Sequence, residues 1–507
     1  MPVTPRPATL WPPNHVTTDI LVLGSGLAGL RAAWAAAEAN PSLTVTVVRA
    51  EAGPTGSSFA NRNNALGIQL PDTDARRAAF CAEVLALGDP GLMDPALVAI
   101  LAEEAEARVR ELSTLDLRFR QTDRGARARF PGCGSLEARA LIFDDLLDAF
   151  NQFYSKTISC GVAFLNGVEI LGILTNDGAA WGAWGVEMTT GEPMALRGRA
   201  VIMALGGPAP LFARHQAGRG SSGLGLGMLA DAGVLTANEP YLQFMWGREN
   251  GAFLTPARLL GPGNRLMMPE SVLPDASLLD PSEAVGQALN ELRAARALHC
   301  PAFHHRPQAV LDRLLLRGLH PDGLARVITP GGEIRAGLFA HAGNGGAVVD
   351  EHGATTLSGL FAVGECATGM HGANRLGGAM VLATQVFGRR AGLGATQYAA
   401  GAELMDPAKF DQCYKEVVRH VEASEEGRLI LQTIAHGLSL HALFGGTPGH
   451  GDGLKALRAD LAELARSSDR RVRLAALGGL LVSRPTGDAF QADFWQRNRT
   501  QITPARQ

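Results

Sequence analysis

A strand, a glycine turn and a helix near the N-terminus constrain the fold of this chain more than any other feature. Residues 18–39, TDILVLGSGLAGLRAAWAAAEA, place a G-x-G-x-x-G pattern between an apolar strand and an alanine-rich helix. In such a turn Gly24 allows the tight bend, Gly26 lets a pyrophosphate approach the backbone, and Gly29 lets the helix pack on the strand. The free N–H groups and the dipole of the helix N-terminus then favour a phosphate. A second apolar strand, LTVTVVRA, follows, so the pattern predicts a dinucleotide-binding unit.

The position expected to contact the ribose departs from the usual pattern. About 20 residues after the glycines, an acidic side chain normally meets the ribose hydroxyls, but this position holds Arg49. Glu51 lies two residues further on and is the candidate to replace it.

Three later glycine stretches favour FAD over NAD as the dinucleotide. VIMALGG, SSGLGLGMLADAG and GLFAVGECATGMHGANRLGG each join a strand or turn to a glycine pair or a glycine-started helix. A flavoprotein needs such late segments because its isoalloxazine and ribitol lie far from the adenine. Each stretch alone is an ordinary turn, but together and in this order they predict FAD, with Glu365 meeting a ribitol or ribose hydroxyl. The cofactor-binding residues predicted from these patterns are Gly24, Ser25, Gly26, Ala28, Gly29, Glu51, Gly206, Gly364, Glu365 and Gly378.

Composition excludes several other classes of protein. The chain has 507 residues, enough for two or three domains, and a net charge of −3. The sequence has no stripe of Lys and Arg residues, so it does not indicate nucleic-acid binding. The six cysteines are scattered without a CxxC pair, which argues against disulfides, structural zinc and an iron–sulfur cluster. HCPAFHH, at His299–His305, has suitable metal-ligand types but no flanking carboxylate, so we expect no metal.

The N-terminal segment and the apolar runs bear on the location of the protein. The N-terminal MPVTPRPATLWPPNH is proline-rich and lacks an apolar segment, so we expect no signal peptide. No apolar run approaches the roughly 18 residues that a membrane helix needs. We therefore expect a cytoplasmic protein with no membrane span.

Four stretches together resemble one known family. DILVLGSGLAGLRAA, GPTGSSFANRNNALGI, AHAGNGGAVVDEHGATTLSGLFAVGE and TGMHGANRLGGAMVLATQVFGRRAG are similar to the succinate dehydrogenase/fumarate reductase flavoproteins, with L-aspartate oxidase as the nearest branch. The C-terminal LLVSRPTGDAFQADFWQRN resembles a degenerate form of the Ser-Arg-Gly ending of that family. The resemblance covers most of the chain and is weakest between Gly251 and Leu338.

The resemblance implies an α/β fold with three parts. An FAD-binding Rossmann-like domain would comprise residues 1–243 and 341–395. An inserted α+β capping domain would occupy 244–340, and a C-terminal helical domain 396–507. In this family the GSSFANR loop meets the flavin, which implies contacts from Ser57 and Ser58. Since Ser57 stands where respiratory members carry a flavin-linking histidine, the FAD is expected to be non-covalent.

The resemblance also implies a carboxylate site between the flavin and the cap. The His of the family's H-x-x-x-G-G stretch maps to His341, and the Arg of GANR maps to Arg375. A guanidinium is a planar, always-charged fork suited to a carboxylate, and a histidine adds a second donor. The alternative for Arg375 is an internal pair with a carboxylate such as Glu365.

The far side of this site departs from the family. The family's QFHPT reads QFMWG at Gln243–Gly247, which removes its second His and its Thr. Its proton-shuttling Arg, in a stretch like APRDVVARAI, aligns with Ser282 in DPSEAVGQAL. Arg258, in TPARLLGPG, survives nearby and is the third catalytic candidate beside His341 and Arg375. Met245 and Trp246 are expected to make this side apolar, or to let it accept a larger substrate.

These departures change the expected chemistry. Making or breaking a C–C double bond needs a positioned acid or base, which raises the rate by roughly 10²–10⁴-fold. In the family a proton-shuttling Arg serves as this group, and the Ser282 that aligns with it cannot replace its cation. Oxidation of a C–N or C–O bond is less demanding, because solvent or a histidine can take the proton. We therefore predict an FAD-dependent oxidase or dehydrogenase of a carboxylate-bearing amine or hydroxy substrate, a small molecule, and one route for its electrons is a partner subunit. The alternatives are an L-aspartate oxidase- or fumarate reductase-like enzyme with a rearranged cap, and an accessory FAD-bound subunit of a larger complex.

Overall fold

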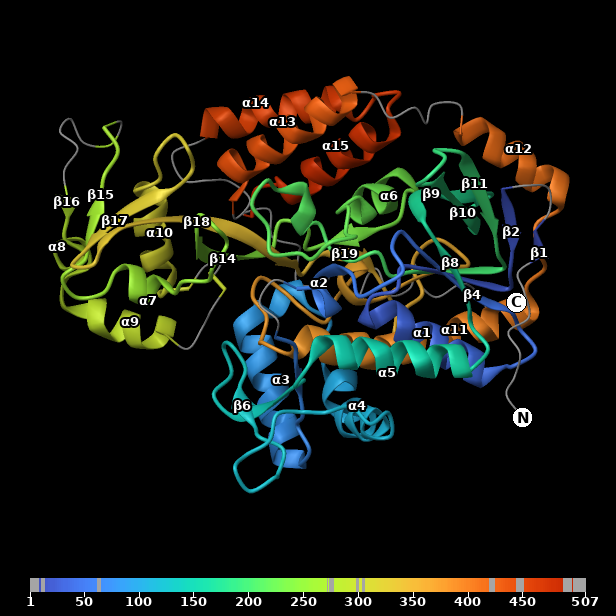
Figure 1. Ribbon diagram of the computed structural model, residues 1–507, viewed down its shortest axis with the longest axis horizontal. Coiled ribbons are helices and arrows are strands. Elements are labelled where there is room, and N and C mark those ends of the chain that lie inside the picture. Colours follow the sequence, from blue (N-terminus) through green and yellow to red (C-terminus); the bar gives the residue numbers. More distant parts are fainter. Residues whose placement is uncertain are drawn as a thin grey trace.

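A five-stranded parallel sheet forms the centre of the molecule (Figure 1). The computed structural model describes residues 9–10, 14–61, 65–270, 272, 278–297, 301–302, 306–418, 425–443, 451–486 and 495. The strand order of this sheet is β20 (Leu360–Ala362), β12 (Ala200–Met203), β3 (Ile20–Leu23), β4 (Val45–Arg49) and β8 (Ala163–Asn166). All neighbouring pairs are parallel, so the carboxyl ends of the strands meet at one edge. This is the edge where α/β sheets bind ligands.

Two long helices pack on each other and on this sheet. They are α1 (Leu27–Ala39), which follows the glycine turn, and α11 (Ala379–Gly401). Small residues allow the close approach, because a Cβ on Gly392 of α11 would collide with the carbonyl oxygen of Ala32 in α1. Segments more than 300 residues apart in the chain therefore form one unit.

A second, mostly antiparallel layer covers another side of the central sheet (Figure 1). Its strands, in spatial order, are β1 (Thr9–Leu10), β2 (His15–Thr17), β11 (Pro193–Arg197), β10 (Ala179–Glu187) and β9 (Val168–Asn176). Two small sheets add β5 (Gly67–Gln69), β7 (Ala138–Ile142) and β6 (Phe130–Pro131), and β13 (Thr236–Ala237), β19 (Gly346–Val348) and β21 (Ala367–Thr368). The helices of this region are α2 (Gly56–Phe59), α3 (Asp74–Gly88), α4 (Pro95–Ser113), α5 (Leu146–Ser159) and α6 (Gly225–Asp231). Short 3-10 turns lie at Pro90–Leu92, Ala209–Leu211 and Gly364–Cys366.

The cap is a separate antiparallel sheet with its own helices. The sheet contains β14 (Leu242–Arg248), β18 (Gly332–Gly343), β17 (Ala325–Thr329), β15 (Arg265–Met267) and β16 (Leu278–Leu279). Around it lie α7 (Pro256–Leu259), α8 (Pro281–Val285), a 3-10 turn at Gly286–Ala288, α9 (Leu289–Ala297) and α10 (Ala309–Arg317). The predicted boundaries at 243/244 and 340/341 fall inside β14 and β18, so these two strands run from the central region into the cap.

Within the described residues, four helices follow α11. They are α12 (Pro407–Val417), α13 (Glu425–His441), α14 (Gly451–Leu464) and α15 (Arg470–Val482). Helix α15 packs closely on α6, where a Cβ on Gly227 would meet the backbone of Leu474. Arg484, just after α15, pairs with the buried Glu239 at 3.4 Å. These contacts fix the C-terminal helices on the segment that leads into β14.

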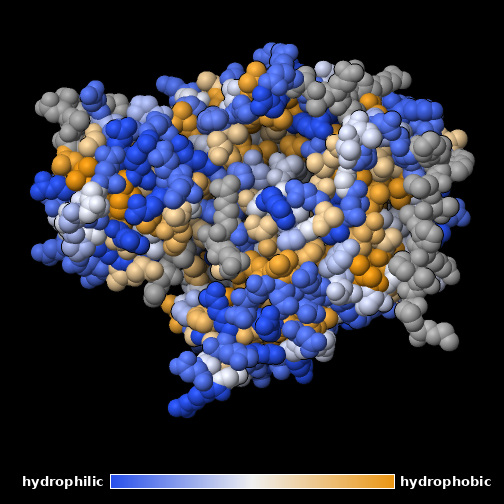
Figure 2. Space-filling view, viewed as in Figure 1, coloured by the Kyte–Doolittle hydropathy of each residue, from blue (hydrophilic) through white to orange (hydrophobic). Residues whose placement is uncertain are grey.

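The observed architecture confirms the predicted α/β class with a cap and a helical C-terminal region. Figure 2 shows mostly hydrophilic residues over the cap, with a few hydrophobic ones among them, and larger groups of hydrophobic residues on the central region. Within the described residues, no helix is both long and apolar enough to cross a membrane.

Two sequence features fall partly outside the described residues. Five of the seven residues of HCPAFHH (299, 300 and 303–305) are not described, and the described part of the chain contains no cluster of potential metal ligands. Most of the Ser-Arg-Gly-like ending after Thr486 is likewise outside the described residues, except Trp495. Among the described cysteines, Cys81, Cys160, Cys366 and Cys413 are free thiols.

Candidate functional site

Two glycines of the turn after β3 have no room for a side chain. Gly24 has φ +104°, and a Cβ there would collide with the carbonyl of Ala204. A Cβ on Gly29 would collide with the carbonyl of Gly24. Gly24 and Gly29 are therefore required by the backbone itself.

Gly26 differs, because a Cβ there would meet only the hydroxyl of Ser58, at 3.5 Å. Gly26 is the N-cap of α1 and makes no side-chain cap. The backbone N–H of Leu27 donates to that same Ser58 hydroxyl at 3.2 Å. The hydroxyl of Ser25 is buried without a partner. An open glycine and an unpartnered hydroxyl at a helix N-terminus suit the pyrophosphate of a dinucleotide.

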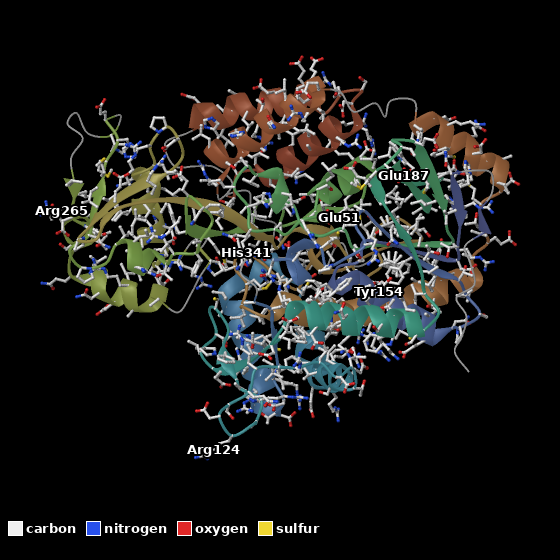
Figure 3. The ribbon with its side chains drawn as sticks, in the orientation of Figure 1. Glu51, Arg124, Tyr154, Glu187, Arg265 and His341 are labelled. Carbon is white, nitrogen blue, oxygen red and sulfur yellow. The ribbon has the colours of Figure 1, made fainter. Side chains whose placement is uncertain are left out.

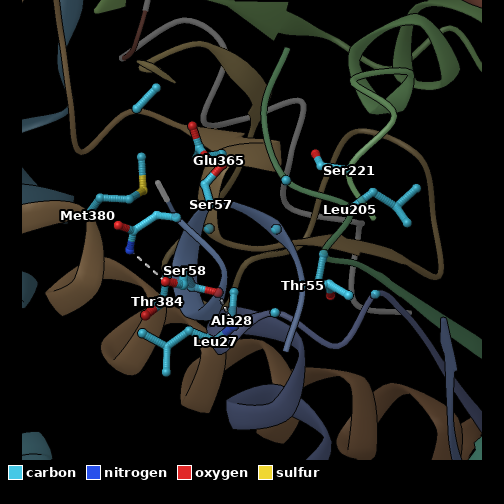
Figure 4. A pocket seen from close by; sticks show the side chains of 18 of the residues that line it. Leu27, Ala28, Thr55, Ser57, Ser58, Leu205, Ser221, Glu365, Met380 and Thr384 are labelled. Carbon is cyan, nitrogen blue, oxygen red and sulfur yellow. Dashed lines mark hydrogen bonds between the residues drawn. The ribbon is translucent and has the colours of Figure 1, made fainter. Parts of the chain in front are cut away.

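One cavity of about 730 Å³ begins at this turn and extends to the cap. Figure 4 shows part of its lining, with Ser58 beside Leu27 of α1 and Ser57 beside Glu365. The predicted site residues that line it are Gly24, Ser25, Gly26, Ala28, Glu51, Ser57, Ser58, Gly206, Gly364, Glu365, Gly378, His341 and Arg375. The structure thus brings together residues that come from five separate stretches of the chain. Gly29 and Arg258 are not part of the lining.

The end of the cavity beside β4 carries opposite charges. Arg49 donates from Nε to the Oδ1 atom of Asn166 at 2.6 Å and lies over the rings of Tyr154 and Phe164. Glu51 keeps its carboxylate at the cavity, 3.7 Å from the guanidinium of Arg219. This geometry leaves Glu51 available to accept hydrogen bonds from ribose hydroxyls.

Glu365 lines the same cavity. It follows β20 in the 3-10 turn Gly364–Cys366, and its Oε1 accepts from the N–H of Gly343 at 2.9 Å. The Ser57 hydroxyl also hydrogen-bonds to this carboxyl group. Burial raises the pKa of Glu365, and the positive charge of Arg375 offsets part of that rise. Glu365 is thus a hydrogen-bond acceptor held in the cavity lining, of the kind that can accept from a hydroxyl group.

Arg375 is a buried cation with unused donors. Its Nη2 donates to the Oε1 of Gln243 at 2.8 Å, whereas its Nε and Nη1 are buried without hydrogen-bond partners. Burial lowers the pKa of this guanidinium to about 10, and the charge of Glu365 raises it again in part. Glu365 thus influences Arg375 through its charge, and the hydrogen bond of Arg375 goes to Gln243 instead. Arg375 lines the cavity, and guanidinium nitrogens without partners are groups that a carboxylate could satisfy.

His341 lines the same cavity from a distortion of the cap sheet. On β14, Gln243 pairs with Ala342 and Phe244 pairs with Ala340, so His341 is an extra residue in β18 at a bulge. Bulges often re-aim a side chain beside a functional site. Its Nδ1 is buried without a partner. Burial, and then the charge of Arg375, lower the pKa of His341 to about 4. Figure 3 shows His341 between the cap and the central region, far from Arg265 at the outer edge of the cap.

The opposite wall is apolar, but not through the two residues expected. Met245 lines the cavity with Phe253 and Pro301. Trp246 is fully buried and donates from Nε1 to Asp312 at 2.9 Å, so its predicted place in the wall was wrong. Successive side chains of a strand point to opposite faces. Only one of two adjacent residues in β14 can therefore face the cavity.

Two cap residues singled out in the sequence lie elsewhere. Arg258 is exposed on α7, and Ser282 is exposed on α8, where it donates to the Asp280 carboxylate. The structure therefore does not bring Arg258 to His341 and Arg375.

Comparison with known proteins decides the family. A family model described as an FAD binding domain matches residues 19–270 and 333–381, which is more than half of the chain. L-aspartate oxidase of Caulobacter vibrioides is 30% identical over 77% of this chain and 78% of its own length. The chain belongs to the succinate dehydrogenase/fumarate reductase flavoprotein family. FAD is its cofactor, and it is an FAD-dependent oxidoreductase.

Other relatives of this flavoprotein carry two kinds of name. L-aspartate oxidase of Halobacterium salinarum is 28% identical over 94% of this chain and 95% of its own. A subunit of the fumarate reductase (CoM/CoB) of Methanothermobacter marburgensis is 28% identical over 75% of this chain and 73% of its own. Among solved structures, Sdh1 of Mycobacterium smegmatis has a TM-score of 0.70 at 22% identity, covering 93% of this chain and 86% of that one. The last likeness shows the fold.

Sequence reasoning missed several lining residues of this flavoprotein. The sequence pattern assigns no role to Gln243. In the structure its side chain makes two hydrogen bonds to Arg375: it accepts from Nη2, and it donates to the Arg375 carbonyl at 3.3 Å. The retained Gln-Phe of the QFHPT stretch was the available signal. Phe253 and Pro301 carry no such signal, because they belong to the part of the cap where the resemblance is weakest. Other lining residues that were not predicted include Cys133, Met380 and Thr384.

Proposed function

We propose that this flavoprotein is an oxidase or dehydrogenase that removes a hydride from a carboxylate-bearing substrate with an amine or hydroxyl group on the reacting carbon. The observation that carries this proposal is Arg375, a cavity-lining guanidinium with two buried nitrogens, Nε and Nη1, that have no hydrogen-bond partner, together with the unpartnered Nδ1 of His341, which lines the same cavity. A buried charge left unpaired is costly. A site built this way is therefore suited to receive one anionic group.

Each residue has a distinct task in this proposal. Arg375 binds the substrate carboxylate, and Gln243 fixes the guanidinium plane. A bound FAD would supply the acceptor for the hydride that leaves carbon. His341 takes the proton that leaves nitrogen or oxygen, and its lowered pKa of about 4 keeps it neutral at physiological pH. Because the charge of Arg375 contributes to that low pKa, a carboxylate bound on Arg375 should raise the pKa of His341 and make it a better base.

The structure gives little support for an acid that could protonate carbon. Ser282 is exposed and hydrogen-bonded to Asp280, and the strand position of the family's second histidine holds Met245. Oxidation of a C–N or C–O bond does not require protonation of carbon. The positions of Ser282 and Met245 therefore favour oxidation of an amine or alcohol over reduction of fumarate.

A second candidate is L-aspartate oxidase or fumarate reductase activity with a rearranged cap. The names and coverage of the relatives favour it. In that case Arg258, which lies on the cap, would supply the missing cation after a rearrangement, and Arg258→Ala would abolish turnover. A third candidate is an accessory FAD-bound subunit, supported by a relative that is itself one subunit of an enzyme. The proposal further includes a cytoplasmic location and electron transfer to a partner subunit.

The test is bleaching of bound FAD, under anaerobic conditions, by a panel of amino acids and hydroxy acids. We expect at least one to reduce the flavin, and fumarate to reoxidise it poorly. Arg375→Ala should retain FAD but lose substrate affinity or turnover by about 1.5–3 kcal/mol, the value of a charged hydrogen bond. Arg389→Ala, a half-exposed arginine outside the cavity, is the matched control and should behave like wild type. Undiminished turnover in Arg375→Ala would remove the anchor, and an unreactive flavin across the panel would favour the accessory role.

A further inference from the structure

The substrate end of the cavity has one polar side and one apolar side. Arg375, His341 and Gln243 form the polar side. Met245, Phe253 and Pro301 form the apolar side. The two sides share β14, because Gln243 and Met245 are two residues apart and face the same way along the strand.

The apolar side is held together by backbone pairing with β14. Pro301 pairs with Met245 in an isolated antiparallel bridge, and Phe253 pairs in the same way with Gly247. Met245 is 7% exposed, and Pro301 is also buried. All three residues are therefore fixed to one strand, which makes them a formed wall rather than a chance contact.

The charges along the cavity are unevenly distributed. Among the described lining residues, only Arg49 and Arg375 are arginine or lysine. Arg49 lies at the β4 end, bonded to Asn166 and covered by Tyr154. Among the residues that the structure describes, the substrate end thus offers one fixed cation, Arg375. A second carboxylate on the substrate would face methionine, phenylalanine and proline, where its desolvation is not compensated.

We propose that the substrate is a 2-amino or 2-hydroxy monocarboxylate with an apolar side chain, which packs against Met245, Phe253 and Pro301. The inference rests on the proposed function and narrows it, because dicarboxylates become the disfavoured class. Met245 and Phe253 are then specificity-determining residues.

Binding of unreactive carboxylates tests this wall without turnover. The FAD-loaded protein is titrated with 4-methylpentanoate and with succinate, and dissociation constants are measured by calorimetry and by perturbation of the flavin spectrum. We expect 4-methylpentanoate to bind at least about 10-fold more tightly, since burying its apolar carbons is favourable and a second carboxylate is not. Equal or tighter binding of succinate would overturn the inference.

Turnover separates failure of the inference from failure of the proposed function. Anaerobic flavin reduction is compared for L-leucine and 2-hydroxy-4-methylpentanoate against L-aspartate and L-malate. We expect the apolar members to exceed the dicarboxylates by roughly 100-fold in kcat/KM. If aspartate or malate is the better substrate, the inference fails while the proposed function stands. If none reduces the flavin, the proposed function itself fails.

A charge introduced into the wall provides the matched variant. Met245→Arg should weaken 4-methylpentanoate binding about 10-fold or more and strengthen succinate binding. Met267→Arg adds the same charge to the cap outside the cavity and should change neither. FAD content and the thermal midpoint report folding, and Phe253→Lys replaces Met245→Arg if the latter does not load FAD. An unchanged ratio of the two dissociation constants in the folded variant would exclude these residues from the substrate wall.

Discussion

Individual residues of the cavity separate into those that the backbone needs and those that a ligand needs. A side chain on Gly24 or Gly29 would collide with neighbouring backbone, whereas a Cβ on Gly26 would meet only the Ser58 hydroxyl. The G-x-G-x-x-G pattern alone does not distinguish these roles. The distinction predicts opposite consequences for substitutions that look alike in the sequence.

Gly26→Val should abolish FAD binding while leaving the rest of the protein folded. Its side chain would occupy the space of the pyrophosphate without colliding with protein backbone. Gly29→Val should instead destabilise the fold, because its Cβ collides with Gly24. The measurement is flavin released by acid per mole of protein, together with circular dichroism. From wild type, acid should release all FAD, since Ser57 offers no flavin-linking histidine. Full FAD content in Gly26→Val would contradict this assignment.

Residue type and spacing were enough to predict the strand, turn and helix at one end of the cavity, because these elements lie within a few residues of each other. They were not enough for the substrate end. Trp246 was misassigned because strand alternation places it opposite Met245. Arg375 could be proposed as a carboxylate anchor, but its partner Gln243 lies 132 residues away and carries no charge to attract notice.

At the scale of elements, a buried ion pair stands behind the apolar wall. Arg296 on α9 and Asp312 on α10 are fully buried and 2.9 Å apart, and Asp312 also accepts from Trp246 of β14. The pair therefore joins two cap helices to the strand that carries Met245. No sequence pattern predicted it, since the three residues belong to separate elements whose packing is not encoded locally.

Asp312→Ala should destabilise the cap by about 3–5 kcal/mol, because it leaves the Arg296 charge buried without this carboxylate. Replacing both residues, as Arg296→Met with Asp312→Leu, should cost less, because no buried charge is then left behind. Glu270→Ala removes an exposed carboxylate of the cap and serves as the control. Hydrogen exchange of cap amides measures the local stability. A double variant less stable than Asp312→Ala would contradict this account.

For the whole molecule, two buried histidines link stability to pH. Burial lowers the pKa of His341 to about 4, and burial and the charge of Arg375 lower the pKa of His371 well below 6.5. The imidazole rings of His341 and His371 are therefore both neutral in the folded state. In the unfolded chain the same side chains titrate near 6.5.

The unfolded state therefore binds more protons than the folded state below about pH 6.5. The contribution that these neutral histidines make to the free energy of unfolding is fully present above pH 6.5. It is lost as the pH falls from about 6.5 toward 4. Glu365, whose pKa is raised by burial, acts in the opposite sense. The test thus compares the urea midpoint of wild type with that of His371→Gln between pH 7.5 and 4.5. The variant should show a weaker pH dependence, and identical slopes would exclude His371 as a contributor.

The continuity of β14 and β18 has a mechanical consequence. Two paired strands, rather than loose linkers, join the cap to the central region. Any rotation of the cap must bend these strands, and the ladder is interrupted at the bulge between Gln243 and Phe244. Bending would concentrate there, so the hinge axis would pass beside the His341 imidazole and the amide that steadies Arg375. Closing the cap and aiming the reactive groups would then be a single movement.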